Sequence, residues 1–287
     1  MGNTNTIDSI KKTNPAAKVL MYIFLAFWAL VNLFPIYFMF TFSLKSNEEI
    51  FGANIIGLPK DWLWSNYSRA MGTGNMGLYF VNSLLVTTLA IGISLFAAMM
   101  ATYAITRISW KLSKLTNAFF MLGLTIPIQA SIVPVYVVLS KLHWLNKYST
   151  LIVPYSAFAL SMSILICTGF MVEIPYALDE AARIDGCSLT GTFFRIILPL
   201  MKPAMATQGI FCFVGSWNQL FLPQILLTRK KLYTMPIMVS LLKGDIYKTE
   251  YGAVYLGLAL TILPLFVVYF LLSKYIIAGV ALGGVKG

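Results

Sequence analysis

The sequence predicts an all-α membrane protein with six transmembrane helices, and three observations support this class. Hydrophobic residues make up 59% of the 287 residues, only 11% are charged, and the mean hydropathy is +0.79. Soluble domains carry about 25% charged residues. The charged side chains, 21 basic and 10 acidic, also fall in seven clusters separated by long uncharged stretches. This excludes an ordinary soluble enzyme, and loops beside anionic lipid explain the net charge of +11 better than nucleic acid does.

Each uncharged stretch is long enough to cross a bilayer, which takes roughly 20 apolar residues. A soluble protein with six such helices would be very unusual, because soluble helices average about 11–12 residues. The first stretch is too long for a cleavable signal peptide and no small-x-small site ends it, so we expect it to stay in the mature protein. In chain order the stretches are Val19–Leu44, Ala70–Thr106, Leu115–Ser140, Tyr148–Val172, Pro203–Thr228 and Tyr251–Ser273.

Prolines occur in most of these stretches. Proline breaks helices in water, but in a membrane bundle neighbouring helices can satisfy the carbonyls that it leaves free. We therefore expect kinks rather than helix ends at Pro35, Pro127, Pro134, Pro154, Pro223 and Pro264.

The predicted spans contain no Asp, Glu, Lys, Arg or His, and the only histidine, His143, lies in a loop. Ion-driven carriers commonly place ionisable groups at membrane depth, so this class is disfavoured. The chain has no GxxxxGK[ST] loop, no HExxH, no nucleophile elbow and no CxxC pair. We expect no covalent chemistry, cofactor or metal on this chain, and energy for uphill transport must come from a partner.

The loop between the fourth and fifth spans, residues 173–202, carries seven of the charges and predicts a helix–turn–helix. Pro175 suits the first turn of a helix over Tyr176–Ile184, Gly186 supplies a stop with positive φ, and Ser188 can cap a second helix ending near Pro199. The small side chains of Ala181 and Ala182 make part of the first helix thin. From physics alone, insertion into a groove of another protein and adsorption on the lipid surface are equally good readings.

The residues of this loop resemble a known family. Glu180-Ala181-Ala182, Gly186 and Ile196-x-Leu198-Pro199 match, at every defined position, the EAA motif of permeases in ATP-binding-cassette (ABC) importers. Arg183 and Asp185 agree within the motif. The resemblance covers almost the whole chain and is greatest to the six-span member of the maltose-type carbohydrate permease pair. It is carried further by residues 45–49, Asn82-Ser83-Leu84, Gly215-Ser216-Trp217-Asn218 and Gly284-Val285-Lys286-Gly287.

The resemblance implies a single permease domain over residues 1–287 with the type I ABC importer fold, in the cytoplasmic membrane. It implies a cytoplasmic N-terminal segment (1–18), a cytoplasmic coupling loop (173–202) docked on an ATPase, and a cytoplasmic tail (278–287). Charge bias does not decide this orientation, because eleven of the 21 basic residues fall on one side and ten on the other. The implied partners are a second permease, two ATPase subunits that bind ATP and Mg, and an extracellular binding protein that delivers a sugar or oligosaccharide.

Two alternatives stay open. A permease of the same architecture could import glycerol-phosphate or another polar solute, although the spans lack basic residues that would favour an anion. A stand-alone secondary carrier would need an ionisable group in the spans. Binding of an ATPase subunit separates the second alternative from the importer.

An uncharged path suits a neutral, hydroxyl-rich solute, which pairs with amides and stacks on aromatic rings. Polar or aromatic side chains in the spans can equally make hydrogen bonds between helices, worth about 0.6–2 kcal/mol. The candidates for the path are Asn117, Gln129, Tyr155, Gln208, Trp217, Asn218 and Gln219.

Three segments outside the spans are candidate contact surfaces. The loops Ser46–Met76 and Arg229–Glu250 mix aromatic and polar residues, which fits a binding-protein surface or an aromatic belt at the lipid interface. The tail Ala278–Gly287 has four glycines, so we expect no stable helix there. The tail is either a frayed end or an extended contact with the ATPase subunits through Lys286.

Overall fold

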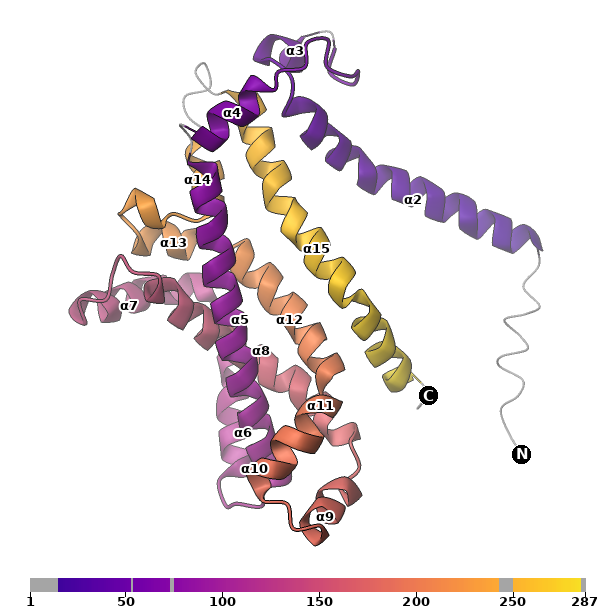
Figure 1. Ribbon diagram of the computed structural model, residues 1–287, viewed down its shortest axis with the longest axis vertical. Helices are drawn as coiled ribbons and strands as arrows, with labels where there is room; N and C mark the ends of the chain where they lie inside the picture. The colour runs from indigo at the N-terminus through magenta and orange to yellow at the C-terminus, as the bar shows by residue number, and fades with distance from the viewer. Residues whose placement is uncertain (1–14, 53, 73–74, 243–249, 285–287) are drawn as a thin grey trace. The chain divides into compact units, whose positions relative to one another are not determined.

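The computed structural model describes residues 15–284 except 53, 73–74 and 243–249, with side chains as far as residue 273. All regular structure in these residues is helical, which confirms the predicted class. Four helices are long and apolar enough to span a membrane, and two bent pairs raise the number to as many as six. The chain divides into two compact units, Met1–Ala70 with Asp245–Ala259 and Met71–Gly244 with Leu260–Gly287 (Figure 1).

The first unit contains α2 (Pro15–Phe42), α3 (Asn47–Phe51), most of α4 (Ser65–Gly72) and the start of α15 (Tyr251–Gly284). The most apolar window of α2 has none of its residues buried, so its side chains face lipid or a partner. Helix α2 begins at Pro15, inside the segment 1–18 that we expected to precede the first span. Arg69 and Glu250 form an exposed bidentate ion pair (2.7 and 2.8 Å) between α4 and the residue before α15.

Lys45 organises the loop that follows α2. Its side chain is 1% exposed, and Nζ donates to the carbonyls of Asn54 (2.8 Å), Ile55 (3.1 Å) and Gly57 (2.6 Å). Burial lowers the pKa of Lys45 from its ordinary value, and the charge of Glu49 acts in the opposite direction. The buried ammonium is compensated by three carbonyls, so the loop folds around it.

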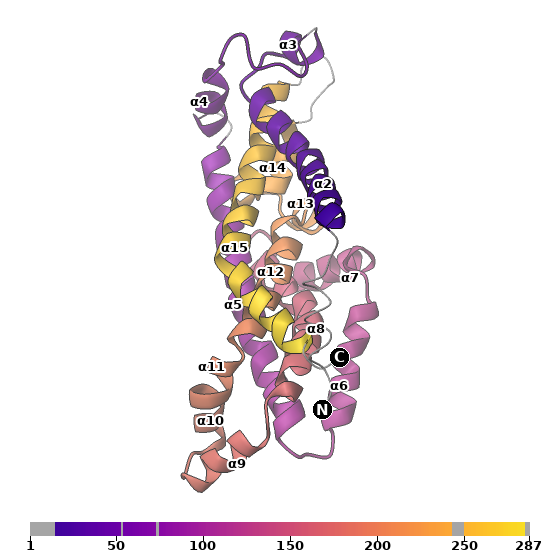
Figure 2. The same ribbon diagram turned by 90° about the vertical axis from the view of Figure 1, so that its right-hand side faces the viewer.

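The second unit is built on α5 (Met76–Arg107) and α8 (Ser149–Glu173), which pack along their length (Figures 1 and 2). Near their starts, the Tyr148 hydroxyl donates to Asn82 Oδ1 (2.9 Å), and at their ends Arg107 donates to the carbonyl of Met171 (2.6 Å). The two helices therefore run in the same direction. Small side chains at the contact, such as Ala90 and Ser156, let the backbones approach closely.

The third expected span is bent rather than kinked. Helix α6 (Ser113–Leu122), continued by η1 (Gly123–Thr125), meets α7 (Ile128–Lys141) at 104°. The break lies at Ile126 and Pro127, whose φ and ψ values are extended. Proline disfavours the helical conformation in the residue before it, so the helix ends here and a new one begins. The pair leads to the start of α8, where Tyr148 lies beside Asn82 of α5.

The fifth expected span is also shorter than predicted. Helix α12 (Lys202–Trp217) ends before α13 (Phe221–Leu226), so Pro223 lies in a separate short helix and does not kink a continuous one. The segment Leu189–Leu200 leads into α12 with a bend of 72°. After α13 come η3 (Lys230–Leu232) and α14 (Met235–Leu242). By contrast Pro35, Pro134, Pro154 and Pro264 do lie inside helices.

Helix α15 corrects our expectation for the tail. It continues without interruption to Gly284, although we expected no stable helix after residue 278. Each residue added to an existing helix gains a hydrogen bond without a new nucleation cost, which offsets the weak propensity of the glycines. Lys286 lies outside the described residues.

Candidate functional site

The loop with the EAA residues folds as a helix–turn–helix. Helix α9 (Ala177–Ile184) presents Glu180, Ala181 and Arg183 to solvent, and Ile184 is 86% exposed. Ala182 is only 3% exposed and faces the permease, so this motif residue is not available to a partner. The exposed face of α9 combines an acidic, a basic and an apolar side chain on a thin helix.

Gly186 ends α9 with a Schellman motif. Its φ is +80°, as the sequence predicted, and its N–H donates to the Arg183 carbonyl (3.0 Å). The Cys187 N–H donates to the Ala182 carbonyl (2.8 Å), so two carbonyls at the end of α9 are satisfied. Asp185 and Gly186 are exposed at this turn.

The second arm of the loop is fixed to the bundle. Ser188 Oγ accepts from the Gly191 N–H (3.1 Å) and caps α10 (Leu189–Thr192), as predicted. A π-helical turn, η2 (Phe193–Ile197), then leads into α11 (Leu198–Leu200). Pro199 has no N–H to continue the regular ladder, which accounts for the wide turn directly before it. Phe193 and Ile197 are buried in a core with residues of α5, α8 and α12, whereas Leu198 is half-buried and Pro199 exposed.

The inner face of α9 rests on a buried charge that the sequence analysis missed. Asp179 lies 3.1 Å from Arg107, with their side chains 8% and 2% exposed. The Arg107 guanidinium also stacks on the Tyr176 ring (4.2 Å). Arg107 and Asp179 are far apart in sequence, and each looks like an ordinary loop charge, so no local pattern pairs them.

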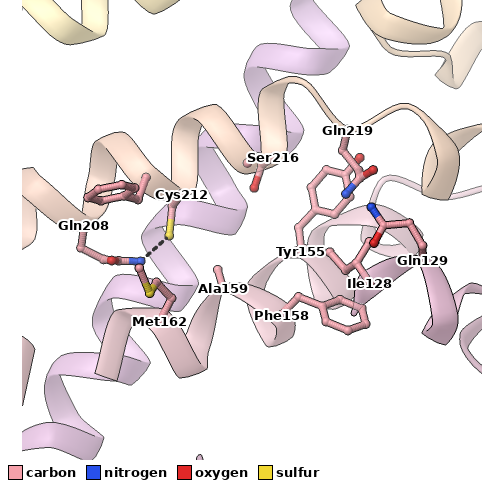
Figure 3. Close-up of a pocket in the computed structure, with 12 residues that line it drawn as sticks. Ile128, Gln129, Tyr155, Phe158, Ala159, Met162, Gln208, Cys212, Ser216 and Gln219 are labelled. Atoms are coloured by element: carbon pink, nitrogen blue, oxygen red, sulfur yellow. Dashed lines mark hydrogen bonds between the residues drawn. The ribbon is translucent and has the colours of Figure 1, made fainter. Parts of the chain in front are cut away.

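A cavity of about 280 Å³ lies between α7, α8 and α12 (Figure 3). It brings together four of the seven candidates for the solute path, Gln129, Tyr155, Gln208 and Gln219. No lining residue is Asp, Glu, Lys, Arg or His. The lining is completed by eight residues that were not predicted for the path, Ile128, Phe158, Ala159, Met162, Phe211, Cys212, Gly215 and Ser216.

Two of the lining residues carry a buried polar atom with no hydrogen-bond partner among the described residues, namely the Tyr155 hydroxyl and Gln208 Oε1. Tyr155 is 4% and Gln208 1% exposed. Gln208 Nε2 is used internally, since it lies 2.6 Å from Ser163 Oγ and 2.9 Å from Cys212 Sγ. An unpaired buried hydroxyl or amide oxygen costs about 1–3 kcal/mol, so both atoms favour a ligand that can pair with them.

The other three candidates lie elsewhere. Trp217 is 1% exposed, donates from Nε1 to the Thr261 carbonyl (2.9 Å) and stacks on Phe213. Asn218 caps the end of α12 by donating to the Val214 carbonyl (3.1 Å). Asn117 lies on α6, away from the cavity lining. Trp217 and Asn218 therefore serve helix packing and capping in this structure.

The described residues contain no cluster of three or more His, Cys, Asp or Glu that could hold a metal ion. The two candidate sites are one exposed helix and one uncharged cavity.

Comparison with known proteins identifies the family. Residues 90–281 match the model of the binding-protein-dependent transport system inner membrane component. The chain is 34% identical to a putative ABC transporter permease of Caldicellulosiruptor sp. (93% of this chain, 96% of the relative). It is 30% identical to a trehalose/maltose transport system permease of Thermococcus litoralis (94% and 97%). A bacterial ABC transporter that imports the acidic polysaccharide alginate has the same fold, with a TM-score of 0.79, 19% identity and coverage of 96% and 99%. The chain therefore belongs to the binding-protein-dependent inner membrane permeases, which confirms the resemblance seen in its EAA residues and makes it a transport subunit rather than an enzyme.

Proposed function

We propose that this chain is one permease of an ATP-driven importer for a neutral sugar or oligosaccharide. The cavity carries this proposal, because it is uncharged and is lined by three glutamines, a tyrosine and two phenylalanines. Two of these residues, Tyr155 and Gln208, also carry a buried polar atom without a partner among the described residues. Hydroxyl groups of a sugar can donate to Gln208 Oε1 and exchange hydrogen bonds with Tyr155. Relatives named for diacetylchitobiose, arabinooligosaccharide and trehalose/maltose transport support the same solute class.

The cavity is small for such a solute. Its volume of about 280 Å³ is near the lower end, about 300 Å³, of small-molecule sites. It therefore holds part of an oligosaccharide at a time, and a second permease subunit supplies the facing wall of the path.

In this proposal the ATPase acts on the permease through α9. Two ATPase subunits bind ATP and Mg, and the exposed residues Glu180, Ala181, Arg183 and Asp185 contact one of them. ATP-driven closure of the ATPase pair moves the coupling helices and reopens the path to the outside, where an extracellular binding protein delivers the solute. Both termini and the loop 173–202 are cytoplasmic in this arrangement.

Uptake by the reconstituted transporter tests the solute class. The complete complex, with its binding protein outside and ATP inside proteoliposomes, is supplied in turn with radiolabelled maltose, trehalose, diacetylchitobiose and digalacturonate. We expect ATP-dependent uptake of at least one neutral disaccharide and none of the anionic one. Uptake of digalacturonate alone, or of no sugar, would refute the proposed solute class.

A pair of glutamine variants connects uptake to the cavity. Gln129→Leu removes an exposed amide that lines the cavity, whereas Gln224→Leu removes an exposed amide on α13 that does not. We expect only Gln129→Leu to lower uptake. Equal effects of the two variants would remove the cavity from the path.

A further inference from the structure

Arg107, the last residue of α5, attaches α5 to the end of α8. Its Nη2 donates to the carbonyls of Met171 and Ile174, both at 2.6 Å. The last carbonyls of a helix have no partner within the helix and carry partial negative charge, so a guanidinium is a strong partner for them. These two short bonds fix the orientation of Arg107 relative to α8.

The contacts of Arg107 with the coupling helix are of another kind. Nη1 lies 3.1 Å from Asp179 Oδ2, yet neither oxygen of Asp179 and neither Nη1 nor Nε of Arg107 has a hydrogen-bond partner among the described residues. The Tyr176 ring stacks on the guanidinium at 4.2 Å. Ion pairing without hydrogen-bond alignment and stacking on a ring are less directional than the two short bonds to α8, so Arg107 holds α9 less rigidly than it holds α8.

Stability alone does not account for this pair. A buried ion pair gains little over apolar side chains of similar volume, because the cost of removing both charges from water offsets their attraction. The pair instead links three helices at one place. Arg107 connects α9 with α5, which is distant in sequence, and with α8, which directly precedes it. The Tyr176 hydroxyl adds a second attachment to α5 by donating to the Thr106 carbonyl (2.7 Å).

We propose that Arg107 and Asp179 form the pivot on which the coupling helix is mounted, and that a displacement of α9 by the ATPase reaches α5 and α8 together through Arg107. This inference rests on the proposed function, since it assigns the path by which the ATPase drives the permease. Both are positioning residues, because they contact neither solute nor nucleotide.

The decisive variant is the apolar replacement Arg107→Met with Asp179→Leu, which keeps the packing but removes the pivot. Asp179→Asn alone removes one charge, and Arg107→Lys keeps the charge but loses the fork that reaches three oxygens. Lys141→Gln is the control, since it neutralises an exposed charge at the end of α7, outside the loop 173–202. Each variant is assembled with its partner subunits, and the yield of monodisperse complex shows whether it folds.

Two readouts test the pivot. The first is solute imported per ATP hydrolysed, measured with the disaccharide that the wild-type complex imports fastest among the four named above. The second needs no solute and is the affinity of the permease pair for the ATPase subunits in MgATP. We expect the double variant to assemble but to lose about tenfold in both readouts, within the range typical of coupling between sites. Arg107→Lys should retain more of both than the double variant, and Lys141→Gln should match the wild type.

Wild-type values of both readouts in the double variant would overturn the pivot and leave the pair a packing feature. If the double variant does not assemble, Asp179→Asn and Arg107→Lys test the pivot instead. Wild-type values of both readouts in these two variants would also overturn the pivot. If the wild-type complex imports none of the sugars, the proposed solute is wrong, while the affinity for the ATPase still decides the pivot.

Discussion

Tyr155→Phe isolates one atom of the cavity, because it removes the buried hydroxyl and leaves the ring in place. In the described part of the chain this hydroxyl has no hydrogen-bond partner, so its removal breaks no contact within the protein. An unpaired buried hydroxyl costs about 1–3 kcal/mol, and we therefore expect the unfolding temperature of the complex to stay the same or to rise. A hydrogen bond to solute is worth about 0.5–1.5 kcal/mol net, so kcat/KM for uptake should fall about 2- to 12-fold.

Tyr148→Phe is the matched control for this substitution. The Tyr148 hydroxyl donates to Asn82 Oδ1 at 2.9 Å and does not line the cavity. Its removal should lower the unfolding temperature and leave kcat/KM unchanged, which is the opposite pattern. The measurements are thermal unfolding of the purified complex and initial uptake rates over a range of solute concentrations. Wild-type kcat/KM in Tyr155→Phe, or a lowered unfolding temperature, would refute the assignment of this hydroxyl to the solute.

Three further predictions concern the coupling loop, the topology and the tail. Gly186→Val places a Cβ at a φ of +80° with no other atom within 4 Å of it, so the cost is backbone strain of about 1–2 kcal/mol. Association with the ATPase should weaken in this variant. Gly186→Asn should restore the association, because asparagine tolerates this conformation. Equal association of both variants would contradict the role of the turn. In intact cells a membrane-impermeant maleimide should label a cysteine placed by His143→Cys but not Cys187. Cys167 and Cys212 are buried and should not react. Labelling of Cys187 but not of the cysteine at 143 would show that the topology is the reverse of the one proposed. Deletion of residues 281–287, which include Lys286, should lower solute-stimulated ATP hydrolysis at constant complex yield, and unchanged stimulation would refute a contact between the tail and the ATPase.

Features set by local chemistry could be predicted from the sequence. The positive φ of Gly186 and the cap by Ser188 depend on a few neighbouring residues, and both occur as expected. The long uncharged stretches likewise predict helices because lipid leaves the backbone no other way to satisfy its polar groups. At Pro127 the same reasoning gave a kink, but the extended conformation of Ile126 separates two helices.

The cavity could be predicted only in part, because an apolar helix gives little sign of which way each side faces. Gln208, Cys212 and Ser216 recur at helical spacing along α12, with Gln219 just after its end, and this periodicity was the available signal for one shared face. Trp217 follows Ser216 directly but points to the Thr261 carbonyl. The contact between Arg107 and Asp179 depends on tertiary packing of α9 against α5, which no local pattern encodes.

The break between η1 and α7 has a consequence for hydration. The two arms, Ser113–Thr125 and Ile128–Lys141, each rise only roughly 20 Å if helical throughout, which is less than the about 30 Å of hydrocarbon. Backbone that is not helical at such a depth is tolerated only where protein or water surrounds it. Gln129, two residues after the break, lines the cavity, so the break and the cavity form one uncharged niche. A sugar that enters this niche can replace its bound water by protein groups one hydroxyl at a time. Its hydroxyl groups then never contact the hydrocarbon core without a hydrogen-bond partner.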